Sequence, residues 1–145
     1  MKKKAAIIDF LGTVVIPSES PRRLLPIPGA AEAIKRLSQE FDIYISSESP
    51  VIFIKDWAEK NDLLNVITAI YGSNNGIKTE HLKDILQKNK YAIILYIADG
   101  PEDLNVNCEN MIKIAVNLHL DDGYENMRVY RGSLTVDLIE KYMEG

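Results

Sequence analysis

The stretch AAIIDFLGTVV, residues 5–15, contains the features that decide the fold. Its apolar part ends at Asp9, and Gly12 with Thr13 then turns the chain, while Leu11 stands where a second carboxylate is expected. A near-continuous apolar run is typical of a strand that is buried on both faces of a parallel sheet. The stretch therefore predicts a buried strand that ends on an acidic side chain.

Strand-like and helix-like segments alternate along the rest of the chain. Apolar segments typical of strands follow at residues 41–47, 66–72, 91–99 and 112–118. Helical patterns occupy residues 29–41, 51–63, 80–89 and 133–145. This alternation predicts an α/β fold, a three-layer Rossmann-like parallel sheet with helices on both faces and right-handed crossovers. We expect one core domain over residues 1–145, and the four prolines of residues 15–28 predict an ordered loop there and no regular element.

The composition limits the partners and sites that this chain can have. Its 145 residues are 46% hydrophobic, which suits one compact domain. A net charge of -4 and a pI near 5.2 do not indicate the excess of positive charge that a nucleic-acid-binding protein carries. Cys108 is accompanied only by His81 and His119, so neither an intrachain disulfide nor a Cys/His zinc cluster is expected. Because no segment approaches the ~18 apolar residues of a membrane helix, we expect a soluble, cytoplasmic protein.

Polar residues at the predicted strand ends are the candidates for a site, because parallel sheets bind ligands at the carboxyl ends of their strands. These residues are Asp9, Ser46, Ser47 and Asp99, and Asp103 follows Asp99 across a Gly-Pro turn. Asp99 and Asp103 can act as oxygen ligands of a hard divalent cation. They can equally be acidic residues that the helix dipole favours at a helix start. The residues alone leave both interpretations open.

The order of these pieces resembles the haloacid dehalogenase superfamily of phosphatases and phosphotransferases. The first motif of that family, Asp-x-Asp-x-Thr, is similar to DFLGT at residues 9–13, and the second, a strand ending in Ser or Thr, to IYISS at 43–47. The third, a lysine ahead of a helix, is similar to GIKTEHL at 76–82, and the fourth, an acidic pair after a strand, to LYIADGPEDL at 95–104. Each motif alone is weak, but their order is specific. The resemblance implies the α/β core of that family.

The resemblance also implies a Mg²⁺ site and a nucleophile. Asp9 would form an aspartyl-phosphate and serve as a metal ligand, and Leu11 would offer its main-chain carbonyl to the ion. Asp99 would bind Mg²⁺ directly, and Asp103 would bind it directly or through water. Carboxylate and carbonyl oxygens are the ligands that this cation prefers. A metal there would offset the charge of a transferred phosphoryl group.

Further residues would bind the phosphate. The resemblance implies that Lys78 neutralises the carboxylates and that Ser46, Ser47 and Thr13 hold phosphate oxygens. A solvated lysine and serines that satisfy the backbone at a strand end are the alternatives, and they stay open.

Leu11 is the departure from the family pattern. The second aspartate of the first motif is the general acid and base in the family's phosphatases, and leucine can do neither. Positioned proton transfer is typically worth ~10² to 10⁴ in rate, so catalysis would be weak. Glu19 or Glu48 are candidates to replace the acid. A nonpolar residue here also occurs in members whose leaving group needs no protonation, including the dehalogenases.

The spacing of the motifs bears on the substrate. The intervals 13–46 and 47–78 are too short for the cap domain that many relatives insert there, so we expect a capless member. An uncapped site is more often associated with large phosphorylated partners, and it argues against a dehalogenase. Three hypotheses follow: a weak Mg²⁺-dependent phosphohydrolase or phosphotransferase, a pseudoenzyme that binds metal and phosphate, and a dehalogenase-like hydrolase.

Overall fold

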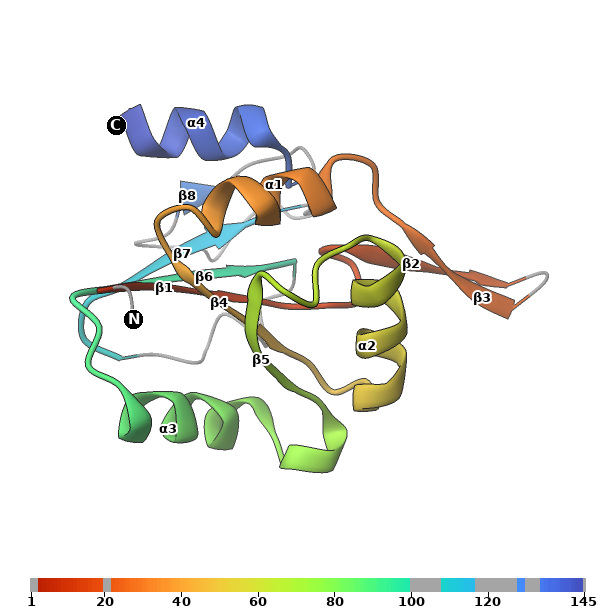
Figure 1. Cartoon of the computed structure of the whole chain (residues 1–145), viewed down its shortest axis with the longest axis horizontal. Helices are drawn as coiled ribbons and strands as arrows, with labels where there is room; N and C mark the ends of the chain where they lie inside the picture. The colour runs from red at the N-terminus through yellow and green to blue at the C-terminus, as the bar shows by residue number, and fades with distance from the viewer. Residues whose placement is uncertain (1–2, 20–21, 100–107, 117–127, 130–133, 145) are drawn as a thin grey trace.

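A six-stranded parallel sheet forms the centre of the molecule (Figure 1). The computed structural model describes residues 3–19, 22–99, 108–116, 128–129 and 134–144. In spatial order the strands are β5 (Ile67–Tyr71), β4 (Asp42–Ser46), β1 (Lys4–Ile8), β6 (Ile93–Ala98), β7 (Met111–Ala115) and β8 (Arg128–Val129). Every pairing between neighbours is parallel. The predicted Rossmann-like sheet is confirmed.

Helices cover both faces of this sheet. They are α1 (Ala30–Leu37), α2 (Val51–Lys60), the short 3-10 helix η1 (Ser73–Asn75), α3 (Lys78–Lys88) and α4 (Val136–Glu144). Figure 1 shows α1 and α4 together on one side of the sheet and α3 on the other. Arg36 of α1 and Glu140 of α4 form an ion pair of 2.6 Å between these neighbours. Among the helices of the described residues, none has the length and hydropathy to cross a bilayer.

The alternation of side chains along β1 explains the two helical layers. Ala6 and Ile8 pack into the core that includes residues of α1, α2 and α4. Ala5 and Ile7 point the other way, into the core that includes Leu82 of α3. Successive side chains of a strand point to opposite faces of a sheet, so a strand buried on both faces is apolar throughout. The apolar run of residues 5–8 is therefore the cause of the layered fold.

The strand order reverses beside β1, and this reversal indicates where on the sheet a ligand site is expected. After β1 the chain builds β4 and β5 on one side, and it then returns to build β6 on the other side. Open α/β sheets bind ligands at the point where the strand order reverses. Ile8 and Ile97 are paired in the register of β1 and β6, so Asp9 and Asp99 both follow at this edge of the sheet.

Residues 15–28 differ from the sequence prediction. They contain an antiparallel hairpin of β2 (Val15–Glu19) and β3 (Arg22–Pro26), so the predicted loop without regular structure is wrong. Proline is excluded from central strands because it has no N–H to donate, but both strands of a two-stranded hairpin are edge strands. Pro17 and Pro26 therefore fit within the strands. Figure 1 shows the hairpin extending away from the central sheet.

Candidate active site

The loop after β1 holds Asp9 at the strand end. The Asp9 amide donates to the carbonyl of Ile97 on β6 at 2.9 Å, so the residue keeps the position that the sheet gives it. The chain then turns, with the Val14 amide donating to the Phe10 carbonyl at 3.0 Å. Asp9 is 5% exposed. The carboxylate is therefore held in a mostly dry environment at the edge of the sheet.

Asp99 reaches the same loop from β6. A Cβ atom added to Gly12 would lie 1.8 Å from Oδ2 of Asp99, so the Asp99 carboxylate packs directly on the backbone at Gly12. The φ angle of Gly12 is +82°, which a side chain also disfavours. Both the close approach and the backbone angle require glycine here. The structure thus brings Asp99 next to the loop that begins at Asp9, as the sequence predicts.

Lys78 binds Asp9 from the first residue of α3. Its Nζ donates to Oδ1 of Asp9 at 2.9 Å, and the two side chains are 9% and 6% exposed. Burying an ammonium group is costly unless a counter-charge lies beside it. The Asp9–Lys78 pair therefore matters for the stability of the fold as well as for the charge of the site. The alternative of a solvated lysine is excluded by this burial.

The oxygen atoms near Asp9 have the chemistry of a Mg²⁺ site. The carboxylates of Asp9 and Asp99 and the carbonyl of Leu11 are hard oxygen donors of the kind that this cation prefers. Asp103, the fourth predicted ligand, lies outside the described residues. Within the described ranges no three His, Cys, Asp or Glu side chains cluster as a metal site. The chemistry of these donors fits the ion, and the role of Asp9, Asp99 and the Leu11 carbonyl as its ligands stays a prediction.

Ser46, at the end of β4, is held by a histidine that the sequence analysis did not connect with it. Nδ1 of His81 lies 2.8 Å from Oγ of Ser46, and Nε2 lies 3.0 Å from the carbonyl oxygen of Gly72. A carbonyl only accepts, so Nε2 carries the hydrogen, and in the neutral ring Nδ1 accepts from the Ser46 hydroxyl. His81 follows Lys78 by one turn of α3. This spacing places His81 on the same face of α3 as Lys78, and it is the one signal in the sequence that connects His81 with the site.

The other two predicted phosphate ligands are also buried. Ser47 is 1% exposed, its Oγ accepts from the Ser49 amide at 3.0 Å, and its own amide donates to the Tyr71 carbonyl at 3.0 Å. Thr13 is fully buried, and its hydroxyl has no hydrogen-bond partner among the residues that the structure describes. A buried hydroxyl without a partner is unusual in a folded protein. As phosphate ligands, Ser46, Ser47 and Thr13 stay predictions.

Leu11 places an apolar side chain at the surface of this site. It is 41% exposed, although large apolar side chains are usually buried. Glu48, a candidate replacement acid, is exposed after β4, and the Glu19 side chain lies outside the described atoms. The role of either glutamate as an acid stays a prediction.

The burial of His81 predicts how stability depends on pH. Desolvation lowers the pKa of His81 below its ordinary value, as does the charge of Lys78, while the backbone of Gly72 and Gly76 and the charge of Glu80 act in the opposite direction. As pH falls through about 6.5, the unfolded chain takes up a proton that the folded chain does not bind. The free energy of unfolding should therefore fall with pH, by at most about 1.4 kcal/mol per pH unit for this group.

Urea unfolding of wild type and His81→Gln between pH 5.5 and 7.5 measures this effect. The slope of unfolding free energy against pH should be steeper in wild type than in the variant. Equal slopes would show that His81 does not titrate as its burial predicts.

This chain shares its fold with solved structures, among them proteins named as hydrolases of the haloacid dehalogenase (HAD) type. Phosphoserine phosphatase in its apo form matches with a TM-score of 0.72 and 16% identity, over 98% of this chain and 99% of that chain. The core domain of a Streptococcus pneumoniae protein assigned as a phosphoglycolate phosphatase matches with a TM-score of 0.67 and 19% identity, over 99% of this chain and 97% of that one.

A third match concerns a longer protein that was solved with magnesium. The HAD-hydrolase YfnB from Bacillus subtilis matches with a TM-score of 0.65 and 15% identity over 83% of this chain. This chain spans 57% of the length of that protein. No protein-family model matches the sequence, and no curated protein matches it significantly. The comparisons thus establish the fold.

Proposed function

We propose that this chain is a weak Mg²⁺-dependent phosphohydrolase or phosphotransferase that acts through an aspartyl-phosphate on Asp9. The observation that carries the proposal is the arrangement at the strand ends of β1 and β6. A buried carboxylate, Asp9, is paired with Lys78 at 2.9 Å, and the Asp99 carboxylate packs on the same loop at Gly12. The solved phosphatases that share the fold, one of them named for phosphoserine, support it further.

The side chains suggest how the reaction proceeds. An Asp9 carboxylate oxygen attacks phosphorus, and the leaving oxygen departs with the electron pair of its bond. Lys78 offsets the negative charge that gathers around Asp9 and the phosphate. Mg²⁺, when held by Asp9, Asp99 and the Leu11 carbonyl, would supply further positive charge. Water then attacks the aspartyl-phosphate, which returns the Asp9 carboxylate and releases inorganic phosphate.

Leu11 makes the proposed activity weak. No proton donor stands at its position, so an alkoxide would have to leave unprotonated, and no base stands there to activate water. The same observation favours a second candidate function, a pseudoenzyme that binds metal and phosphate without turnover. The short intervals between the motifs, residues 13–46 and 47–78, leave little room for a cap and favour a large phosphorylated partner as the ligand of either candidate.

Replacing Asp99 by alanine tests the metal site. We expect Mg²⁺ affinity, measured by calorimetric titration, to fall at least about tenfold. Mutation of residues that only orient metal ligands already lowers metal affinity by about 10- to 100-fold. Asp137→Ala is the matched control, because Asp137 is an exposed aspartate in the first turn of α4. An Asp99→Ala protein that binds Mg²⁺ as tightly as wild type would show that the proposed site is wrong.

A further inference from the structure

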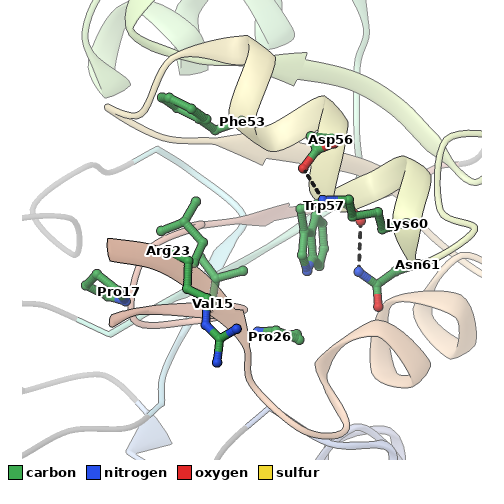
Figure 2. Close-up of a pocket in the computed structure, with 10 residues that line it drawn as sticks. Val15, Pro17, Arg23, Pro26, Phe53, Asp56, Trp57, Lys60 and Asn61 are labelled. Carbon is green, nitrogen blue, oxygen red and sulfur yellow. Dashed lines mark hydrogen bonds and ion pairs between the residues drawn. The ribbon is translucent and has the colours of Figure 1, made fainter. Parts of the chain in front are cut away.

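A cleft of about 710 Å³ lies between the β2–β3 hairpin and α2 (Figure 2). Its volume is within the ~300–1,000 Å³ that sites for small molecules occupy. Val15, Pro17 and Leu24 line it from the hairpin, and Phe53 and Trp57 line it from α2. Figure 2 shows the residues of α2 facing those of the hairpin across the cleft. The cleft therefore offers aromatic and aliphatic side chains on both walls, and its charged or polar lining residues are Arg23, Asp56, Lys60 and Asn61.

The polar groups of the α2 wall already have partners. Lys60 forms an ion pair of 2.9 Å with Asp56, and the side-chain amide of Asn61 donates to the Trp57 carbonyl at 2.8 Å (Figure 2). A ligand is therefore not required to satisfy the hydrogen-bonding groups of Asp56, Lys60 and Asn61. Phe53 is 52% exposed, so its ring has apolar area left to bury against one.

Both walls of the cleft contact the segment of chain that carries Asp9 and Leu11. The Val15 carbonyl accepts from the Gly12 amide at 2.7 Å, so a wall residue of the cleft is bonded to the glycine on which the Asp99 carboxylate packs. Phe10, the residue after Asp9, contacts Trp57 edge to face, with 5.7 Å between ring centroids. Asp9 and Leu11 do not line the cleft themselves, and Gly12 and Phe10 connect their loop to its two walls.

We propose that this cleft holds the leaving group of an aryl phosphate, a phosphate monoester of an aromatic alcohol. The proposal rests on the proposed function of Asp9. Two independent observations lead to it: six of the ten residues that line the cleft are aromatic or aliphatic, and Leu11 gives no proton to a leaving group. A phenol of the tyrosine type ionises with a pKa of about 10, so it can leave as its anion where an aliphatic alkoxide cannot.

The reaction balances without an acid at position 11. The bond between Asp9 and phosphorus forms as the bond between phosphorus and the aryl oxygen breaks, and the aryl oxide leaves with the electron pair. It takes its proton from solvent after release. Water then cleaves the aspartyl-phosphate into the Asp9 carboxylate and inorganic phosphate.

Binding of two phosphonates tests the cleft without any need for turnover. Phenylphosphonate and methylphosphonate share the anionic group and differ in the ring, and both are titrated by NMR with Mg²⁺ present. We expect wild type to prefer the phenyl compound, and Phe53→Ala to lose about fivefold to tenfold of that preference, the worth of an aromatic contact. Ile52→Ala is the matched control, since Ile52 is 71% exposed on the same helix and does not line the cleft. It should keep the preference.

The outcomes separate the cleft from the phosphate site. If both phosphonates bind equally, or if the preference survives in Phe53→Ala, the cleft is not the leaving-group site, while the proposal for Asp9 stands. If neither phosphonate binds, the phosphate site itself fails and the cleft proposal fails with it. A phenyl preference that falls equally in Phe53→Ala and Ile52→Ala would reveal a general effect on α2 and would overturn the assignment.

Discussion

Replacing Leu11 by aspartate is expected to raise kcat/KM for an alkyl phosphate by about 100-fold or more. The change restores a carboxylate beside the leaving oxygen, where it can protonate an alkoxide and then activate water. The Leu11 side chain is 41% exposed, so a carboxylate there stays partly hydrated and the fold should tolerate it. Aryl phosphates should gain less at the first step, because their leaving groups need little protonation.

The matched control for this gain is Leu11→Asn, which has the size of aspartate and no proton to transfer. Steady-state kinetics on glycerol phosphate and on p-nitrophenyl phosphate, with folding verified by circular dichroism, measure both variants. A folded, Mg²⁺-binding Leu11→Asp protein that is no faster than Leu11→Asn would refute the view that Leu11 alone limits catalysis. It would favour the pseudoenzyme.

Asp9→Asn should abolish all phosphatase activity, down to the background of the assay, because an amide cannot form the acyl-phosphate intermediate. The change also removes the negative charge that Asp9 places against the buried Lys78 ammonium, so the thermal midpoint should fall as well. Turnover of p-nitrophenyl phosphate and thermal melting are measured on the same preparations. Lys78→Met with Asp9 intact is a second variant, and it should lower activity through lost charge. Activity that survives in Asp9→Asn would point to another site or to a contaminant.

The central part of the fold could be predicted because its signal lies in local sequence. The apolar residues 5–8 are buried on both faces of β1, and the polar residues at strand ends follow from parallel topology. This is why the amino-acid sequence alone predicts that Asp9 and Asp99 lie at one edge of the sheet.

The parts that escaped prediction depend on contacts between distant residues. His81 binds the hydroxyl of Ser46 at a separation of 35 positions, and no spacing rule relates a helix residue to a strand end that far away. The hairpin of residues 15–26 was hidden by its prolines, which suggest a loop unless both strands are known to be edges. The cleft depends in turn on where that hairpin lies against α2.

The most direct test of the account is whether Asp9 accepts a phosphoryl mimic. Beryllium fluoride binds to carboxylates as an analogue of an aspartyl-phosphate, and ¹⁹F NMR detects the bound form. With Mg²⁺ present, wild type should show a bound fluorine resonance that disappears when Mg²⁺ is chelated and is missing in Asp9→Asn. A wild-type spectrum without a bound resonance, or a resonance that persists in Asp9→Asn, would contradict the proposal that Asp9 is the site of phosphoryl transfer.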